Sequence, residues 1–193
     1  MTELTTSNRP QRADARRNRE RILVAARELF AQEDPEVQID DVARRAGVGV
    51  GTVYRHFPDK EALMGELVRE RFALFNERLR AALDGPEDVT PFDALTDTMR
   101  ANAASLAEDA ATRFAFLSGG ERVFEHAAAE REEYIVLAEE LVERAHAAGQ
   151  LRGEFNAEDI PMVMCGVCAS IDKRAAGWDW KRHLELIIHG MRP

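Results

Sequence analysis

The chain has 193 residues, of which 45% are hydrophobic and 32% charged, so it can fill a core and is not a disordered polymer. It lacks a run of roughly 18 uncharged apolar residues, and no apolar segment follows the polar stretch Met1 to Pro10, so we expect a soluble cytoplasmic protein without a membrane partner. The formal charge of −9 excludes a nucleic-acid binder unless that charge is unevenly distributed.

The charge is uneven. The first 60 residues hold 11 Lys and Arg against 10 Asp and Glu, whereas the remainder holds 15 against 25. Six arginines precede residue 22, namely Arg9, Arg12, Arg16, Arg17, Arg19 and Arg21. Such a cluster suits phosphate groups, although a solvated helix start would explain it equally well. We assign residues 1–12 to a flexible basic arm.

Apolar residues recur at helical spacing, with no alternation long enough for a strand, and predict an all-α fold of about nine helices. The first helix covers about 13–32. Short helices at 40–46, closed by Gly47, and at 50–57 complete a DNA-binding domain over 13–58. Val53 and Phe57 lie one turn apart on the inner side of the third helix, which leaves its other side free for a partner.

The remaining helices are expected to form an effector-binding and dimerisation domain over 59–193. Asp59 is the expected cap of a long connecting helix, 59–84, and Thr90 with Pro91 begins the next one. Shorter apolar patterns predict further helices at about 113–117, 123–148, 157–176 and 178–191.

Two short helices joined by a turn at Gly47–Gly49 and braced by a third form a helix-turn-helix, whose second helix enters the major groove of DNA. The stretches IDDVARRAGV (39–48) and GTVYRHFPDKEAL (51–63) carry a more specific signal. On them, the segment 16–67 resembles the tetracycline-repressor (TetR) family. The resemblance implies a dimeric transcriptional regulator of double-stranded DNA, most often a repressor, that responds to a small molecule.

The resemblance also implies roles for residues of the third helix. Thr52, Tyr54 and His56 are expected to contact phosphates, although Tyr54 is alternatively part of the core. Arg55 is the candidate for reading guanine directly, with a phosphate contact as the alternative. Val50 is expected to touch a thymine methyl group, and Gly51 to allow close approach to the groove.

Two further positions at helix starts, Lys60 and Gln38, complete the expected DNA contacts, and two positions, Gln38 and Gly49, depart from the family pattern. Lys60 is expected to bind a phosphate beside a helix N-terminus, with a solvated lysine as the alternative. Gln38 stands where Thr or Ser commonly caps the second helix, and Gly49 stands where Ser commonly caps the third. The loss of both hydroxyl groups costs the fold little but places more of the DNA affinity on the arginine arm.

The C-terminal domain offers candidates for an effector pocket and for a dimer interface. The expected pocket residues combine bulk with polar groups and are Met99, Asn102, Phe114, Phe116, Leu117, Phe124, Tyr134 and Leu137. The last two helices carry dense apolar stripes that predict a four-helix bundle with a second copy, through Val163, Met164, Val167, Ile171, Trp180, Leu184, Ile187 and Ile188. A dimer would read an inverted-repeat operator. The sequence does not identify the effector.

Other functional classes have little support. Cys165 and Cys168 form a C-x-x-C pair, but no further ligands accompany them, so we expect two buried core thiols, no metal and no cofactor. The five histidines are scattered and no nucleophile or phosphate-loop motif occurs, which argues against an enzyme. An architectural DNA-binding protein without an effector remains the alternative, although it would not need so large a C-terminal domain.

Overall fold

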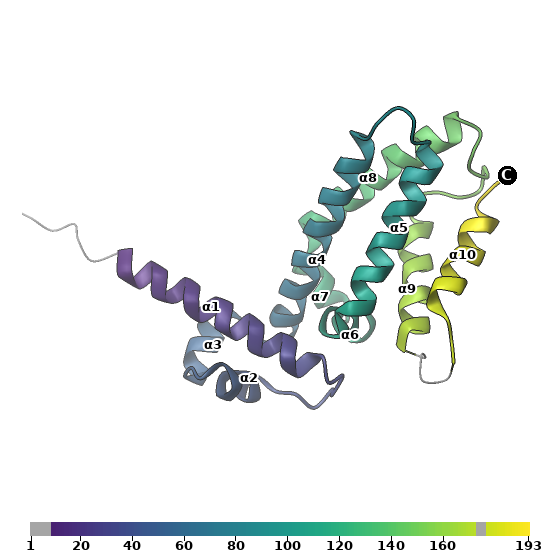
Figure 1. Cartoon of the computed structure of the whole chain (residues 1–193). Helices are drawn as coiled ribbons and strands as arrows, with labels where there is room; N and C mark the ends of the chain where they lie inside the picture. The colour runs from purple at the N-terminus through teal and green to yellow at the C-terminus, as the bar shows by residue number, and fades with distance from the viewer. Residues whose placement is uncertain (1–8, 173–176) are drawn as a thin grey trace, which may run out of the picture.

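A computed structural model describes residues 9–172 and 177–193, with side chains from residue 13 onward, and these residues form helices and connecting loops without a strand. The predicted all-α fold is therefore confirmed. The described helices are α1 (Arg9–Phe30), α2 (Ile39–Ala46), α3 (Val50–His56), α4 (Lys60–Leu83), α5 (Pro91–Glu108), α6 (Ala110–Ser118), α7 (Glu121–Glu125), α8 (Ala128–Ala147), α9 (Asp159–Asp172) and α10 (Trp180–Gly190). In Figure 1, α1–α3 form a small unit beside the bundle made by α4–α10.

The small N-terminal unit is built around the apolar stripe of α1. Ile22 and Phe30 of α1 are fully buried, and Val53 of α3 joins them in the core. Gly47 ends α2 in the left-handed conformation with φ of 63°, as its position in the sequence predicts. Arg21 donates to the backbone carbonyls of Ala46 (2.5 Å) and Gly47 (3.0 Å), which satisfies the exposed end of α2.

Helix starts in the bundle follow the predicted caps. The Asp59 carboxylate accepts a hydrogen bond from the Ala62 N–H at 2.8 Å, and α4 begins at the next residue. Thr90 accepts from the Asp93 N–H at 3.1 Å, with Pro91 at the first helical position of α5. These caps fix where the two helices that frame the bundle begin.

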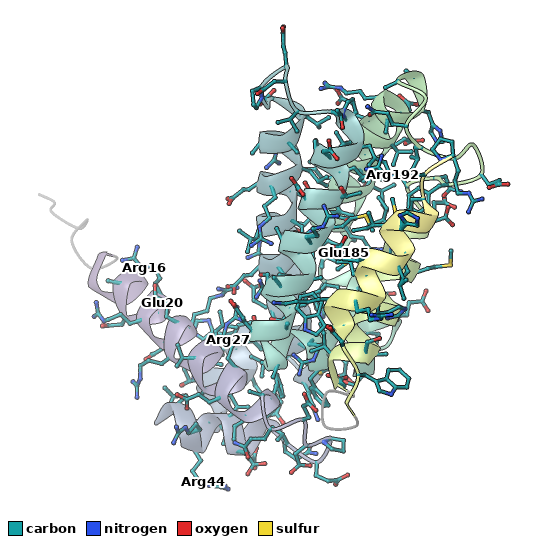
Figure 2. The ribbon with its side chains drawn as sticks, turned by 45° about the vertical axis from the view of Figure 1, so that its right-hand side comes forward. Arg16, Glu20, Arg27, Arg44, Glu185 and Arg192 are labelled. Carbon is teal, nitrogen blue, oxygen red and sulfur yellow. The ribbon has the colours of Figure 1, made fainter. Side chains whose placement is uncertain are left out.

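The bundle packs α4 along α8 and α5, and α9 along α10 (Figure 1). Polar contacts with α5 and α9 help to hold α10 in place. Arg100 of α5 forms a two-point ion pair with Glu185 of α10, at 2.7 and 2.9 Å, and Figure 2 shows Glu185 on the side of α10 that turns toward α5. Ser170 of α9 lies 2.6 Å from the His183 ring of α10. None of the described helices combines the length and apolar character that crossing a bilayer requires.

The structure corrects several predicted boundaries. Helix α1 begins at Arg9, so part of the segment assigned to the arm is helical, while residues 1–8 and 173–176 lie outside the described ranges. The helix predicted over 123–148 is two helices, α7 and α8, with a break at Ala127, where φ is −112° and ψ is 16°.

The break between α7 and α8 has a packing reason. Helix α7 crosses α4 at Gly65 so closely that a methyl group there would lie 2.4 Å from the His126 Cβ. The chain must therefore turn at His126 and Ala127 before α8 can run along α4. Nothing in the apolar spacing of 123–148 signals this crossing, because it depends on a glycine in another helix.

Candidate nucleic-acid interface and internal cavity

Helix α3 is anchored through only one of its sides. Val53 is fully buried, and Phe57, which caps the C-terminal end of the helix, is 4% exposed. Among the other residues of the helix, Val50 is 37% and Tyr54 50% exposed. The predicted inner and outer sides of the helix are therefore correctly assigned, and Tyr54 is not part of the core.

Four exposed residues, Val50, Gly51, Tyr54 and Arg55, form what we call the outer face of α3. A methyl group built at Gly51 would meet no atom within 4 Å, so nothing inside the protomer requires a glycine there. Thr52 and His56, the other two predicted phosphate contacts, are half-buried. Four of the six predicted DNA contacts of α3 thus share one exposed surface, and the other two lie beside it.

The two predicted contacts outside α3 are engaged with the backbone. The Lys60 ammonium donates to the Pro35 carbonyl at 2.6 Å and lies 5.9 Å from the centre of the Phe30 ring. It ties the start of α4 to the loop after α1, and two of its three N–H donors remain for a phosphate. Gln38 is exposed, and its side chain donates to the Glu36 carbonyl at 2.9 Å.

A carboxylate replaces the missing cap at the start of α2. The Asp41 carboxylate accepts from the Gln38 N–H at 3.0 Å and from Arg44 at 2.9 Å. The backbone hydrogen bond from Gln38 is the largest contribution that lowers the pKa of Asp41. The absence of a hydroxyl at Gln38 was evident from the sequence, but the hydrogen bond that Asp41 accepts from the Gln38 N–H was not predicted.

The arginines of the basic cluster divide into structural and exposed groups. Arg19 pairs with Glu66 of α4 at 2.6 Å and stacks over Phe57 at 5.4 Å, so it supports the fold, as does Arg21. Arg16 is well exposed and lies 3.7 Å from Glu20, and Figure 2 shows both near the free end of α1. Arg17 pairs with Asp14. Of the four cluster arginines whose side chains the structure describes, Arg19 and Arg21 are thus engaged within the fold, while the side chains of Arg9 and Arg12 lie outside the described part.

The bundle contains a cavity of about 290 Å³, partly open to solvent, between α4, α5, α6, α7, α8 and α9. Five aromatic side chains dominate its wall, together with apolar, polar and thiol groups. The lining residues are Phe72, Phe75, Asn102, Leu106, Phe116, Leu117, Glu121, Phe124, Arg131, Tyr134, Ile135, Pro161, Met164, Cys165 and Cys168. This mostly apolar, partly open space with few polar groups is typical of a small-molecule site.

The predicted pocket residues are only partly brought together. Asn102, Phe116, Leu117, Phe124 and Tyr134 line the cavity. Three others do not. Met99 is 2% exposed in the core, Phe114 faces Phe30 of α1 with ring centres 6.3 Å apart, and Leu137 packs against the core outside the cavity.

The polar groups of the cavity form a chain that begins outside it. Arg78 donates to the Asn102 Oδ1 at 2.9 Å, which leaves the Asn102 amide N–H to hydrogen-bond the Tyr134 hydroxyl oxygen. Burial raises the pKa of Tyr134 well above its usual value, against a smaller opposite effect of Asn102. Tyr134 is therefore a neutral phenol, and its own proton is available to a ligand.

Helix α6 connects the cavity to the N-terminal unit. Phe116 and Leu117 of α6 line the cavity, and Arg113, 7% exposed on the same helix, donates to Glu33 at the end of α1 at 2.9 Å. Arg113 also pairs with Asp172 at the end of α9. Helix α6 therefore links the wall of the cavity directly to the segment at the end of α1.

A second set of bonds surrounds Asp109, the N-cap of α6. Its carboxylate accepts from Arg27 of α1 at 3.1 Å and from Arg71 of α4 at 2.5 Å, and Figure 2 shows Arg27 where α1 meets the bundle. Burial acts to raise the pKa of Asp109, but hydrogen bonds from Thr112 and Arg71 and the Arg71 charge outweigh it, so the pKa is lowered.

The residues predicted for a dimer interface lie mostly inside the protomer. Val167, Ile171, Trp180, Leu184 and Ile188 are buried, because α9 packs against α5, α6 and α10. Val163, Met164 and Ile187 are half-buried, and Met164 lines the cavity. The apolar side chains that this region exposes are Met162, Trp178 and Leu186, at 66%, 58% and 62%.

Comparisons with known proteins agree with this arrangement. The family model described as "Bacterial regulatory proteins, tetR family" matches residues 22–67. An HTH-type transcriptional regulator of Staphylococcus aureus (strain USA300) is 38% identical over 65 residues, which are 33% of this chain and 35% of that relative. The chain thus matches about a third of the length of this curated relative.

Solved structures match over nearly the whole chain. The TetR transcription regulatory protein from Mycobacterium vanbaalenii is 32% identical, with 95% of this chain and 100% of that chain covered and a TM-score of 0.58. The transcriptional regulator FadR from Bacillus subtilis, solved in complex with stearoyl-CoA, is 19% identical, with 90% of this chain and 99% of that chain covered and a TM-score of 0.69.

Proposed function

Because the chain belongs to the TetR family of bacterial regulatory proteins, we propose that it is a homodimeric transcriptional repressor that a small-molecule effector releases from an inverted-repeat operator. The observation that carries this proposal is the outer face of α3. It presents Tyr54, Arg55 and an unobstructed Gly51 on a helix whose other side is anchored in a core. That is the shape that a major groove accepts.

Dimerisation follows from the apolar side chains that α9 and α10 leave uncovered. Met162 and Leu186 are exposed on these two helices, with Trp178 just before α10. A two-fold pairing of these surfaces would build the four-helix bundle expected from the sequence, with a different set of residues in contact. It would also present two copies of α3 to successive major grooves.

The cavity and α6 supply the route for release. An effector that fits only one of two bundle conformations shifts the population toward that conformation. Since α6 carries both cavity residues and Arg113, its displacement would move Glu33 and α1. The stearoyl-CoA complex of FadR supports the proposal that the bundle of this chain, too, admits a small molecule with an apolar part.

Selection of duplexes from a random-sequence pool, followed by fluorescence anisotropy, tests the proposal. We expect an inverted repeat. Arg55→Ala should lose about 1–3 kcal/mol of discrimination at one base pair of each half-site. Arg80→Ala is the matched control, because Arg80 pairs with Glu133 on an exposed surface of the bundle. Binding of all duplexes alike, steeply weakened by salt, would favour an architectural protein instead.

A further inference from the structure

Both thiols of the chain lie in the wall of the cavity. Cys165 and Cys168 are the only two cysteines in the sequence, and they sit about one turn apart on α9. Cys165 is exposed, whereas Cys168 is 3% exposed. The C-x-x-C pair is therefore not simply core, as the sequence suggested, but a pair of soft nucleophiles that face a preformed space.

The two thiols differ in reactivity. Burial, and to a smaller degree the neighbouring Cys165, raise the pKa of Cys168 to about 12, so its thiol stays protonated near neutral pH. Cys165 lies at the accessible edge of the same wall. An electrophile in the cavity would meet Cys165 as the nucleophile, and Cys168 as a packing group beneath it.

The other walls suit a flat, conjugated carbonyl compound. The Phe72 ring packs edge-on against Phe116 and Tyr134, with centres 5.5 and 5.6 Å away, and these rings offer their cavity-facing edges and faces to a planar ring that lies against the wall. The polar chain from Arg78 through Asn102 leaves the Tyr134 proton for an acceptor such as a carbonyl oxygen. Arg131 offers further N–H donors at the same wall, while Glu121 offers none when ionised.

Because an exposed thiol, an aromatic wall and a phenol donor line the same cavity, we propose that Cys165 captures quinone-type electrophiles covalently within it. This inference rests on the proposed function in so far as the cavity is the effector site. In the reaction, the Cys165 S–H bond breaks as the sulfur forms a bond to the ring carbon β to one carbonyl, the C=C electron pair moves to that carbonyl oxygen, and a proton equivalent to the one the thiol lost is taken up there. The hydrogen of the attacked carbon then leaves as a proton and the second oxygen gains one.

The product is a hydroquinone thioether that contains every atom of the thiol and the quinone. No external oxidant is consumed, because the quinone gains the electron pair that the sulfur supplies. A disulfide between Cys165 and Cys168 would need such an oxidant. A metal centre would need more donors, since the described residues contain no group of three or more His, Cys, Asp or Glu side chains suited to one.

The test compares 1,4-naphthoquinone with iodoacetamide, a small thiol reagent that does not need the cavity. Intact-mass measurement and peptide mapping should show one quinone adduct, at Cys165, in the wild type and in Cys168→Ser, and none in Cys165→Ser. Tyr134→Phe and Phe116→Ala should slow quinone addition about tenfold, as expected for the loss of a hydrogen bond or a ring contact. Neither variant should change the rate with iodoacetamide.

Equal slowing of both reagents, or no slowing of either, would overturn the inference and leave Cys165 an ordinary surface thiol. Anisotropy with the selected duplex separates this result from the proposed function. A cavity-dependent adduct that leaves DNA affinity unchanged would support capture and contradict release by effectors. Release of the duplex by other apolar molecules, together with no adduct at Cys165 after treatment with 1,4-naphthoquinone, would contradict capture alone.

Discussion

Two glycines in the helices of this chain are needed for different reasons. Gly65 lies where a methyl group would collide with His126, so its small size serves the packing of α7 on α4. Gly51 lies on the outer face of α3 with open space around it, so its small size serves something outside the protomer. The sequence shows both as glycines within helices, and only the neighbours distinguish them.

Gly51→Ala should separate DNA binding from folding. Since alanine favours a helix and meets no neighbour here, we expect a free energy of unfolding that is unchanged or raised by up to about 1 kcal/mol. Affinity for the selected duplex should fall at least about tenfold, because the methyl group holds α3 away from the groove. Urea unfolding and anisotropy measure the two effects.

The matched variant Gly65→Ala should instead lower the free energy of unfolding, because Gly65 serves the packing of α7 on α4. Its methyl group overlaps His126, so unfolding should become easier by about 1–3 kcal/mol. If Gly51→Ala bound DNA as tightly as the wild type, the outer face of α3 would not be the contact surface.

Among the elements, α6 has the most connections for its length. It lines the cavity through Phe116 and Leu117, and it reaches α1, α4 and α9 through Arg113 and its cap Asp109. Glu33, which receives the Arg113 bond, has a positive φ of 57°, a conformation that costs a non-glycine residue about 1 kcal/mol or more. The Arg113 contact therefore helps to hold the end of α1 in a strained turn.

Arg113→Met should destabilise the protein by about 2–3 kcal/mol in urea unfolding. The loss falls below that of a fully buried pair, because Glu33 and Asp172 are partly exposed. Arg16→Ala is the control, since Arg16 and Glu20 are both well exposed, and we expect a change within about 0.5 kcal/mol. A loss no larger than in this control would show that α6 is not fastened to α1 through Arg113.

The contacts that Asp109 of the α6 N-terminus makes with α1 and α4 should also weaken at low pH. Because its pKa in the folded protein lies below the ordinary 3.8, the folded state binds protons less readily than the unfolded state. Its contribution to stability is therefore present above about pH 4 and is lost as the pH falls through the lowered pKa. Wild type should lose more stability than Asp109→Asn between about pH 5 and 3 in urea unfolding. Parallel pH profiles for both proteins would contradict this role.

How far the sequence predicted these elements depends on how local each signal is. The caps at Asp59 and Thr90 and the turn at Gly47 were predicted, because each depends on a few adjacent residues. The lining of the cavity was predicted only in part. In the sequence, Phe72 and Phe75 cannot be told from other core residues of α4, because they face the cavity only once α6 and α8 have packed beside them. The polar relay from Arg78 could not be found, since its partner is 24 positions away along the chain.

For the whole molecule, the surface that α9 and α10 leave exposed determines where the proposed dimer contact lies. The apolar stripes of these helices were recognised in the sequence, but periodicity does not tell which stripe a protomer buries for itself. The structure buries Val167 and Leu184 and exposes Met162 and Leu186. We therefore place the proposed dimer contact on the second pair.

Leu186→Glu should yield a folded monomer with weak DNA binding. The side chain is 62% exposed, so a carboxylate there costs the protomer little, whereas two carboxylates facing each other across a two-fold axis repel. Val136→Glu is the control, because Val136 is similarly exposed, at 61%, but lies on α8. Sedimentation velocity gives the oligomeric state. A dimeric Leu186→Glu together with a monomeric Val136→Glu would move the interface to α8.

The unequal division of charge along the chain has a consequence for how the protein meets DNA. Residues beyond 60 carry 25 acidic against 15 basic side chains, and the first 60 are nearly balanced. DNA is a polyanion, so it repels the acidic bundle but not the nearly neutral N-terminal unit. The electric field of the DNA therefore orients the molecule before any contact is made. Random collisions that would present the wrong end are thereby discouraged, and the search along a chromosome proceeds with α3 already facing the duplex.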